Sequence, residues 1–390
     1  MIIKSILDTD LYKLTMQQAV MKLYPRAKVR YTFINRGGAE FPDGFAEKLR
    51  KEVKDMETLA LLKEEKNFLL RATPFLDPTY LDLLYGYRYD ASEVGIIQKG
   101  GKLEISIEGY WHRTILWEVP LMAIISELYF TEAGEHPWGE HERHQNNNKK
   151  KMLFRANGIH YADFGTRRRF SYDVHDEFIR DNIGIGSEQN FVGTSNVHFA
   201  HKYNLKPIGT HAHEWFSFHA AKYGYKMANT LAMEAWVDVY RGDLGIALPD
   251  TFTTDVFFKA FERKFSKLYD GVRHDSGDPI EFAKKAIAHY DKMGIDPRSK
   301  VIIFSDSLNT EKAIEIKDFC RGNIKCSFGI GTNFTNDVGV KPLNMVIKMT
   351  EAKPESDDWM PTIKLSDAQG KHTGDEKEIE ICKHVLKIKS

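Results

Sequence analysis

The first hundred residues carry two kinds of hydrophobic pattern. From Leu11 to Leu23, apolar residues recur at helical spacing, directly after Asp8-Thr9-Asp10, whose side-chain oxygens can cap a helix. This predicts a capped amphipathic helix. Apolar and polar residues alternate over 29–34 and again over 103–107, and a period of two predicts strands. Helix and strands together indicate an α+β unit.

The next segment is less regular. Pro120 opens an apolar run over 121–130, as a proline does in the first turn of a helix, and we place a domain boundary near it. The stretch from Glu132 to Lys151 is polar and includes three consecutive lysines, so few groups offset the entropy of ordering it. We expect an exposed connection or a flexible helix there.

From Ala156 onward, short strand-like runs that end in Gly, Ser, Thr or Asp alternate with helix-length segments, which is the pattern of a βα barrel. The strand-like runs cover 191–194, 207–210, 244–248, 271–274, 301–305 and 326–330. The helix-like segments cover 220–240, 255–269, 279–293 and 310–319. The carboxyl ends of such strands converge on one site. Two later strand-like runs, 343–349 and 361–365, can rejoin the sheet of the first unit.

Composition narrows the class of protein. Lys plus Arg and Asp plus Glu both number 55, so no overall field favours nucleic acid or an anionic membrane, and any anion site must be local. We find no signal peptide and no run of about 20 consecutive apolar residues that would span a membrane. Cys320, Cys326 and Cys382 lack metal-type spacing, and we expect reduced, buried thiols. These features favour a cytoplasmic protein of two domains.

A glycine-rich segment late in the barrel pattern is a candidate phosphate site. Gly329, Gly331 and Thr332 follow a strand-like run, and only glycine lets backbone N–H groups approach a phosphate so closely. The alternative is a strand-to-helix turn without a ligand. The position favours phosphate, because barrels often bind it after their last strands.

A cation, two carboxylates and a hydroxyl surround one glycine in the segment Arg273-His274-Asp275-Ser276-Gly277-Asp278-Pro279. Asp275 and Asp278 can accept hydrogen bonds from sugar hydroxyls or hold Mg²⁺ through water, and Arg273 suits an anionic group. Asp306 follows another strand and adds a carboxylate to the same rim. The alternative is a helix N-cap with a surface ion pair.

Two segments have the groups to bind a planar anion. Phe164 and Arg167 lie in Asp163-Phe164-Gly165-Thr166-Arg167-Arg168-Arg169, where an aromatic ring and cations can stack on and pair with an anionic ring. We expect at least one of the three arginines to be solvated. Gly193-Thr194-Ser195-Asn196 ends a strand with small hydrogen-bonding groups and no carboxylate, so a negatively charged group would be tolerated there.

His211-Ala212-His213-Glu214-Trp215 places two imidazoles and a carboxylate at a strand end, which superficially suggests a metal site. Residues at i and i+2 face opposite sides of a strand. One functional histidine beside one structural histidine is therefore a better interpretation than zinc, and two structural histidines are the remaining alternative.

In their order and spacing, these segments resemble nicotinate phosphoribosyltransferase, and the resemblance extends from Asp8-Thr9-Asp10-Leu11-Tyr12-Lys13-Leu14-Thr15-Met16 to Lys341-Pro342-Leu343-Asn344. It implies an irregular α/β barrel of the type II phosphoribosyltransferase kind over 126–341, and an α+β domain built from both chain ends, 1–125 with 342–390. It also implies a homodimer with shared active sites. The activity would join nicotinate to the ribose of phosphoribosyl pyrophosphate, with ATP and Mg²⁺, in the salvage route to NAD.

The resemblance also implies roles for individual residues. Phe164 and Tyr12, the latter from the neighbouring subunit, would sandwich the pyridine ring, with Arg167 as the inward arginine. The nicotinate carboxylate would bind Arg273, Thr194 and Ser195, and the 5′-phosphate would bind Gly329, Gly331 and Thr332. The acids Asp275, Asp278 and Asp306 would bind ribose hydroxyls and Mg²⁺-pyrophosphate, beside Ser276 and Gly277. His213 would be the phosphorylated histidine.

The chemistry fits these parts, because the bond from ribose C1 to pyrophosphate breaks with oxocarbenium character and the enzyme must hold both reactants and stabilise the leaving group. The ring nitrogen attacks with its lone pair and needs no general base. Several alternatives stay open. Nicotinamide phosphoribosyltransferase and the decarboxylating quinolinate phosphoribosyltransferase share the barrel architecture. A phosphate-binding isomerase would leave the pairing of Phe164 and Arg167 unused, and a non-catalytic metabolite sensor would not need His213.

Overall fold

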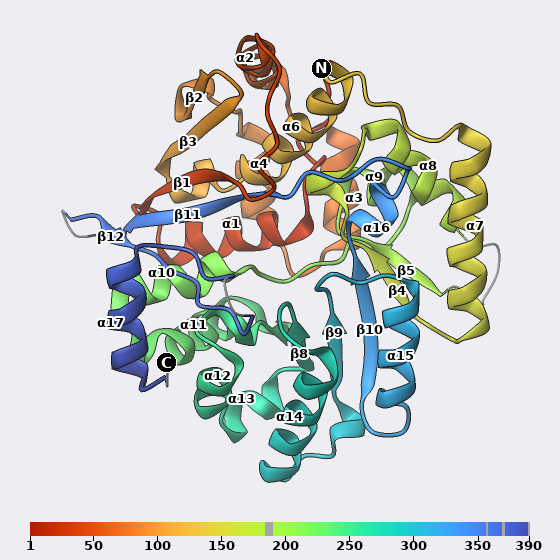
Figure 1. The fold of residues 1–390 in the computed structure, drawn as a ribbon. Helices are drawn as coiled ribbons and strands as arrows, with labels where there is room; N and C mark the ends of the chain where they lie inside the picture. The colour runs from red at the N-terminus through yellow and green to blue at the C-terminus, as the bar shows by residue number, and fades with distance from the viewer. Residues whose placement is uncertain (184–189, 356–357, 369–370, 389–390) are drawn as a thin grey trace.

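The computed structural model describes residues 1–183, 190–355, 358–368 and 371–388. Its strands form two sheets (Figure 1). The first has five strands in the order β12-β11-β1-β3-β2, and the second has six in the order β5-β4-β10-β9-β8-β7. The first sheet is antiparallel and the second is parallel, as the predicted combination of an α+β unit and an α/β barrel requires.

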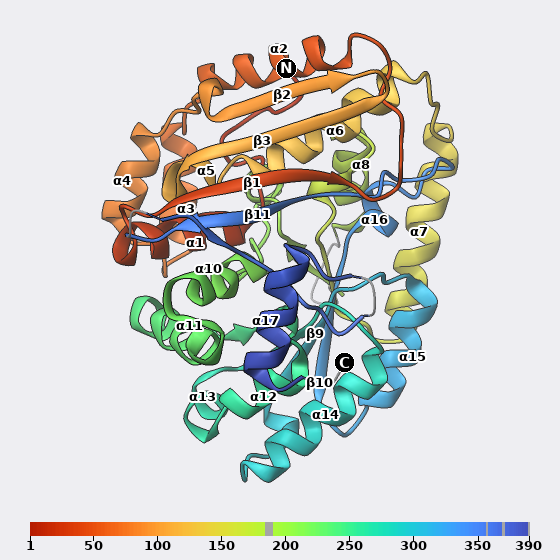
Figure 2. The ribbon, with the colours of Figure 1, turned by 60° about the vertical axis from the view of Figure 1, so that its left-hand side comes forward.

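The antiparallel sheet joins the two ends of the chain. It consists of β1 (Lys28–Asn35), β2 (Val94–Lys99), β3 (Lys102–Tyr110), β11 (Met345–Lys353) and β12 (Met360–Pro361). Figure 2 shows β11, drawn in blue, lying beside β1, drawn in red. The late strand-like runs therefore do rejoin the first sheet, although β11 starts two residues later than the predicted 343–349 and the run 361–365 contributes only its first residue.

The helices of this part are α1 (Leu11–Leu23), α2 (Phe45–Asp55), α3 (Lys63–Ala72), α4 (Pro78–Gly86), α5 (Trp111–Thr114), α6 (Glu118–Glu132) and, near the C-terminus, α17 (Glu376–Leu386). The prediction that α1 is amphipathic and capped by an aspartate is wrong. Polar Lys13 and Gln17 are buried along with its apolar residues, and Asp10 stands at the N-cap position without a capping bond, because its carboxylate is used elsewhere. Helix α1 is thus enclosed by protein.

Among the described residues, one helical stretch, Trp111–Glu132, is long and apolar enough to cross a membrane by length and composition alone, although it is not an unbroken apolar run, since it includes Arg113 and Glu118. Most of its most apolar window, 83%, is buried inside the protein. Pro120 lies in the first turn of α6, where its missing N–H costs no helical bond. The segment is therefore a core helix that the antiparallel sheet and the barrel share.

The parallel sheet consists of β4 (Tyr161–Asp163), β5 (Phe191–Thr194), β7 (Ile246–Ala247), β8 (Gly271–His274), β9 (Val301–Phe304) and β10 (Lys325–Ile330), and β6 (Arg241–Leu244) precedes it. The predicted strand 207–210 has no ladder and makes a single bridge, Thr194 to Pro207. It lies between β5 and β7, since Ile208 N donates to Thr194 O and Thr210 Oγ1 donates to Ile246 O. This weak closure makes the barrel irregular, as predicted.

The helices of the barrel region are α7 (Glu140–Ala156), α8 (Tyr172–Asn182), α9 (Val197–Tyr203), α10 (His213–Tyr223), α11 (Tyr225–Tyr240), α12 (Thr254–Ala260), α13 (Arg263–Leu268), α14 (Pro279–Lys292), α15 (Thr310–Cys320) and α16 (Thr332–Thr335). The predicted helix 220–240 is two helices, because Gly224 has a φ of 80° and ends α10. The predicted helix 255–269 is likewise split into α12 and α13.

Of the two alternatives for the polar stretch 132–151, the structure shows a helix, α7, over most of it. Partly buried ion pairs hold this helix against the barrel: Arg143 contacts Glu177 at 2.7 Å and Lys150 contacts Asp337 at 2.6 Å. Composition counted these side chains as solvated and so did not predict their contacts. The three cysteines are buried and free, as predicted. The exact boundaries 1–125, 126–341 and 342–390 stay a prediction, and within the last range residues 356–357, 369–370 and 389–390 lie outside the described residues.

Candidate active site

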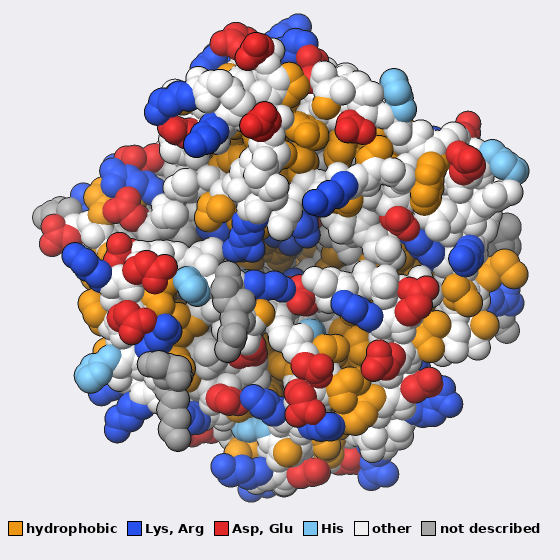
Figure 3. All heavy atoms as spheres, in the orientation of Figure 1, with side chains coloured by type: hydrophobic (Ala, Val, Ile, Leu, Met, Phe, Trp, Pro, Cys, Tyr) orange, Lys and Arg blue, Asp and Glu red, His pale blue; other side chains and the backbone are white. Residues whose placement is uncertain are grey.

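A cavity of about 200 Å³ lies where the carboxyl ends of the parallel strands face the antiparallel sheet. Figure 3 shows this face hollowed near its centre, with Lys and Arg side chains around the hollow. Several of the predicted site residues line the cavity: Tyr12, Phe164, Arg167, Ser195, His213, Arg273, Asp275 and Gly329. The topology thus brings together segments that are up to 317 residues apart in sequence, from Tyr12 to Gly329.

The Phe164 ring forms the floor at one end. It follows β4 and packs directly on Gly329 of β10, where a Cβ atom would lie 2.3 Å from the ring. The guanidinium of Arg273 lies 5.8 Å from the centre of the same ring. A flat, partly exposed aromatic face beside a cation is suited to an anionic aromatic ligand.

Tyr12 and Arg167 meet at Glu118 on another wall. The Tyr12 hydroxyl donates to Glu118 Oε2 at 3.4 Å, and Arg167 Nη1 lies 3.4 Å from Glu118 Oε1. Burial alone would raise the pKa of Glu118, but Lys13 and Arg167 lower it to about 2. Tyr12 of the same chain lines the cavity. The arrival of a second Tyr12 from a neighbouring subunit stays a prediction.

None of the three consecutive arginines is a solvated surface residue, contrary to the prediction. Arg169 is fully buried in a bidentate pair with Asp8, at 2.8 and 2.9 Å. Arg168 is half-buried, and burial together with Arg167 lowers its pKa to about 10. Arg167 alone of the three lines the cavity, which agrees with its choice as the inward residue.

The segment after β5 lies beside a carboxylate that the sequence analysis did not expect there. Ser195 lines the cavity, but its hydroxyl donates to Asp10 Oδ1 at 2.8 Å. A carboxylate therefore does lie at this place, supplied from the start of the chain rather than from the segment 193–196 itself. Thr194 does not line the cavity; its hydroxyl donates to Asp163 Oδ2 at 2.6 Å and is fully buried. Thr194 thus holds β4 and β5 together and has no free hydroxyl proton for a ligand.

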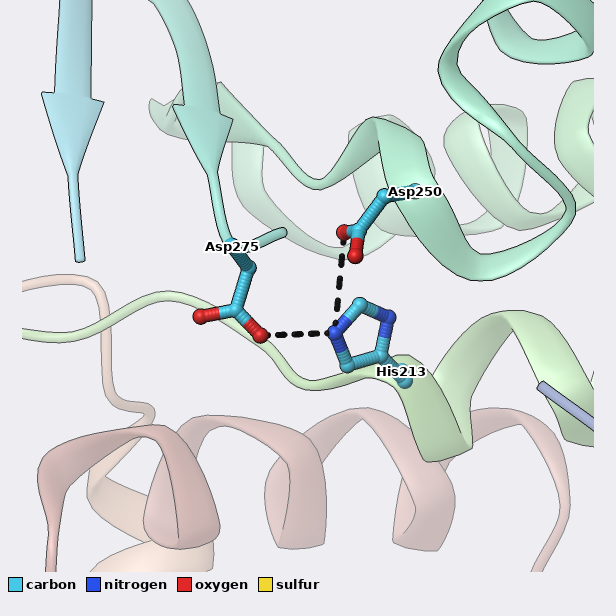
Figure 4. Close-up of side chains that lie close together, drawn as sticks. All are labelled: His213, Asp250 and Asp275. Atoms are coloured by element: carbon cyan, nitrogen blue, oxygen red, sulfur yellow. Dashed lines mark hydrogen bonds and ion pairs between the residues drawn. The ribbon is translucent and has the colours of Figure 1, made fainter. Parts of the chain in front are cut away.

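His213 is the first residue of α10 and points into a cluster of charges (Figure 4). Its Nδ1 lies 2.9 Å from Thr251 Oγ1, and its Nε2 lies 3.0 Å from Asp275 Oδ2 and 3.7 Å from Asp250 Oδ1. Burial first, and the Lys364 ammonium second, lower the pKa of His213 to about 4. The imidazole is therefore neutral near pH 7 and keeps a lone pair.

His213, Asp250 and Asp275 place ligand atoms within 4.8 Å of one another, which is close enough for a metal ion. The Lys364 ammonium already occupies the cluster, 2.8 Å from His213 Nε2 and 3.1 Å from Asp250 Oδ2. A cation is thus built into the protein where zinc would bind. His211 is buried, packs edge-on against Trp236 and does not line the cavity, whereas His213 does.

Arg273 and Asp275 form one unit at the end of β8. Arg273 Nη2 donates to Asp275 Oδ1 at 2.8 Å, and Arg273 Nε donates to Ser305 Oγ at 2.7 Å. Burial would raise the pKa of Asp275, but Arg273, His213 and Lys364 hold it well below its ordinary value. Asp275 is therefore a fixed negative charge that contacts the neutral histidine on one side and the arginine on the other.

The other predicted residues of this rim lie behind the cavity. Ser276 is buried and donates to Asp250 Oδ2 at 2.6 Å, so it positions an acid that sequence reasoning did not select. Gly277 has a φ of 82°, which a turn into α14 requires. Asp278 is exposed and caps α14 by accepting from Glu281 N at 2.8 Å. The alternative of a helix N-cap is thus the one that the structure shows for Asp278.

Two further predictions concern groups for phosphate or magnesium. Asp306 does not line the cavity, and it accepts hydrogen bonds from Lys371 at 3.2 and 3.3 Å. Gly331 and Thr332 are half-buried at the start of the four-residue helix α16, next to the Phe164 carbonyl. Gly329 is covered by the Phe164 ring, so its function in this structure is to let the ring approach the strand.

The sequence analysis gave no site role to several charged residues of the cavity, although Asp10 and Glu214 stand in segments that it named. They are Asp10, Glu118, Glu214, Lys348 and Lys364, all of which line the cavity, together with Lys13 and Asp250 behind them. Lys13 is fully buried between Glu118 at 2.5 Å and Glu214 at 2.7 Å. A lysine on the apolar face of a helix pattern was the signal that could have identified this network.

The chain matches one known protein family over most of its length. Residues 7–126 match the N-terminal domain of the nicotinate phosphoribosyltransferase (NAPRTase) family, and residues 159–390 match the family itself. A nicotinate phosphoribosyltransferase of Chromohalobacter salexigens is 58% identical over 98% of this chain and 98% of its own. The one of Desulforapulum autotrophicum is 52% identical over 98% of this chain and 99% of its own.

Solved structures agree with these matches. The crystal structure of nicotinate phosphoribosyltransferase from Porphyromonas gingivalis superposes with a TM-score of 0.96 and 48% identity, covering 99% of this chain and 100% of that chain. A putative nicotinate phosphoribosyltransferase from Saccharomyces cerevisiae has a TM-score of 0.93 and 35% identity, covering 100% and 99%.

Proposed function

The chain belongs to the nicotinate phosphoribosyltransferase family and is an enzyme that transfers the phosphoribosyl group of phosphoribosyl pyrophosphate to nicotinate, and we propose how its residues perform that transfer and couple it to ATP. The product, nicotinate mononucleotide, enters NAD synthesis. The nicotinamide-specific enzyme and the non-catalytic sensor are not favoured by these comparisons.

The observation that carries the proposal is the meeting of a ring platform and a charge cluster in one cavity. We place the pyridine ring on Phe164 and the base carboxylate near Arg273 and Ser195, because these three residues line the cavity and Arg273 lies 5.8 Å from the centre of the Phe164 ring. The ring nitrogen then attacks ribose C1 directly. The enzyme contributes position and electrostatics, since no group has to remove a proton from the nitrogen.

We assign the cations around the cavity to the anions of phosphoribosyl pyrophosphate. Lys348 lines the cavity, and burial together with Lys364 lowers its pKa to about 8. Arg167 is the second cation on the same side. Positive charge at these places stabilises the departing pyrophosphate, whose negative charge increases as the bond to C1 breaks. Gly331 and Thr332 keep their predicted role of binding the 5′-phosphate. Gly329 contributes indirectly, because it lets the Phe164 ring pack against the strand.

Magnesium fits the oxygen donors of the cluster better than a transition metal does. Asp275 and Asp250 offer hard carboxylate oxygens, and Asp275 is the more exposed of the two, with 22% of its side chain accessible against 2%. Lys364 fills the interior of the cluster. Mg²⁺ would therefore be held by Asp275 on the cavity side, and when bound it supplies neutralisation of pyrophosphate charge.

Coupling to ATP rests on His213. Its neutral imidazole can attack the terminal phosphorus of ATP, forming an N–P bond while the P–O bond to the leaving ADP breaks. The transfer of the phosphoribosyl group to nicotinate does not chemically require this phosphorylation. Its effect is on affinity: phosphorylated enzyme favours substrate binding, and product formation is followed by hydrolysis back to free histidine.

We also retain the homodimer and a cytoplasmic location as proposals. The proposed dimer shares its active sites, with Tyr12 of one subunit completing the ring platform of the other. Sedimentation velocity combined with activity across dilution tests this: activity per chain should fall as the dimer dissociates, and constant activity would contradict the shared site.

The phosphohistidine is tested with His213→Ala and a matched control, His141→Ala, which removes an exposed histidine from α7. Incubation with ATP labelled at the γ-phosphate should give acid-labile, alkali-stable label in wild type and control and none in His213→Ala, whose slow ATP-independent transfer remains. Full ATP coupling in His213→Ala would contradict the assignment of His213 as the phosphorylated residue.

A further inference from the structure

Asp10 is a buried carboxylate at the base end of the cavity. Its side chain is 3% exposed and lines the cavity, and Oδ1 accepts a hydrogen bond from Ser195 Oγ at 2.8 Å. The backbone fixes this pair, because Leu11 N donates to Ser195 O at 2.8 Å and Asp10 forms a bridge with Asn196. The two side chains cannot separate without moving the start of α1.

The charges that face Asp10 come from three elements. Arg167, in the short helix Thr166–Arg168, attracts it; Asp163 of β4 repels it; and Tyr12 of α1 lies beside it. No Lys, Arg or His in the described part of the chain forms an ion pair with it at 4.0 Å or less. Burial, the largest of these influences, raises the pKa of Asp10. The carboxyl is thus neither paired with a cation nor exposed to water.

The Ser195 hydroxyl has one proton, and in the free enzyme that proton is donated to Asp10. A nicotinate carboxylate that approaches Ser195 therefore finds a hydroxyl with no proton left to donate. It also faces the Asp10 carboxylate behind that hydroxyl. Two such charges in a buried place repel strongly. A proton on Asp10 removes both problems, because the acid can donate to Ser195 Oγ and the hydroxyl can then donate to the ligand.

We infer that Asp10 takes up a proton from solvent when the carboxylate of the base binds, and that the relay from Asp10 through Ser195 to the base, rather than Ser195 alone, determines acid-over-amide recognition. This rests on the proposed placement of the base near Ser195. An amide base would bind without proton uptake, because its N–H can donate to the ionised pair. The choice of base thus becomes linked to pH.

The two mononucleotide products give a direct comparison. Nicotinate mononucleotide and nicotinamide mononucleotide share ribose and phosphate and differ only in the carboxylate or amide, so any proton exchanged at the phosphate cancels in the difference. Calorimetric titration of the enzyme at pH 7.5, in two buffers of different ionisation enthalpy, yields the protons taken up with each ligand. We expect about one more proton with nicotinate mononucleotide.

Two variants locate that proton. Asp10→Asn keeps the size and the N-cap preference of the residue, and the difference between the ligands should fall to zero. Glu214→Gln is the matched control, because Glu214 is another buried carboxylate of the same cavity whose pKa burial raises. It should leave the difference intact.

The outcomes separate the inference from the function on which it rests. Nicotinate mononucleotide that binds wild type without excess proton uptake overturns the inference, as does a difference that disappears in Glu214→Gln instead of Asp10→Asn. If neither mononucleotide binds, the placement of base and phosphate in this cavity fails. In steady state, kcat/KM for nicotinate should fall about tenfold per pH unit above the pKa of Asp10 in wild type. It should be flat over that range in Asp10→Asn.

Discussion

Replacing Gly329 by alanine tests whether the Phe164 ring is the platform for the base. The added Cβ would lie 2.3 Å from Phe164 Cε2, whereas carbon atoms in contact prefer about 3.5 Å, so the ring must shift by roughly 3.5 − 2.3 = 1.2 Å. Displacing a positioning group by about 1 Å costs about 100-fold in rate. We expect kcat/KM for nicotinate to fall by about 100-fold, with a stability loss of about 1–3 kcal/mol.

Gly86→Ala is the control away from the cavity. Gly86 is the exposed last residue of α4, and a Cβ added there would meet no atom within 4 Å, so no side chain has to move. Activity should stay within about threefold of wild type. Initial rates of nicotinate mononucleotide formation at saturating phosphoribosyl pyrophosphate and ATP, with thermal unfolding of each variant, provide the comparison.

A Phe164→Ala background completes the test, because Gly329→Ala has no ring to displace there. The second substitution should then change kcat/KM by less than about threefold, the non-additivity expected of two residues in contact. Wild-type kcat/KM in Gly329→Ala, or an equal 100-fold loss with and without the ring, would refute the reasoning.

The remaining predictions concern stability and base choice. Arg169→Met should cost about 3–5 kcal/mol in urea unfolding, because it leaves a buried carboxylate unpaired. Arg298→Met, which removes an exposed ion pair, should leave the urea midpoint nearly unchanged, and equal losses in the two variants would contradict the assignment. Ser195→Asp should lower the ratio of nicotinate to nicotinamide turnover at least about tenfold, since two carboxylates would face the base, and an unchanged ratio removes Ser195 from the specificity argument. Burial lowers the pKa of His211 to about 3 from an ordinary value of 6.5. As pH falls, the unfolded chain therefore binds a proton at this residue before the folded chain does. The contribution of neutral His211 to stability is complete above pH 6.5 and is lost as pH falls toward 3. The urea midpoint should fall by less between pH 7 and 5 in His211→Gln than in wild type.

The sequence predicts most of the fold where local patterning and burial agree. The parallel strands ending at Thr194, His274 and Ile330 were placed within a residue, because each is a short apolar run bounded by turn residues. The segment 207–210 has the same pattern but makes only one bridge. Its neighbour β5 is only four residues long, so the segment finds few backbone partners. The number of available partners depends on the tertiary structure and cannot be seen in a local sequence pattern.

The candidate site divides in the same way. The motifs identified Phe164, the run of three arginines and the pair His211 and His213, because they put unusual groups at strand ends, and the family resemblance then selected Arg167 and His213. Asp278 belonged to an equally dense motif, yet it caps a helix, because a carboxylate before proline serves that role whether or not a ligand is near. The acid that accepts the Ser195 hydrogen bond, Asp10, is 185 residues away in sequence, so only the three-dimensional structure could pair the two.

Initial rates of nicotinate mononucleotide formation test the central claim most directly, with nicotinate or nicotinamide as the base, phosphoribosyl pyrophosphate and Mg²⁺ present, and ATP either present or absent. The account predicts product from nicotinate that ATP stimulates in wild type but not in His213→Ala, and little product from nicotinamide. Equal turnover of both bases would contradict the specificity, and no product from either base would contradict the assignment of this cavity as the active site.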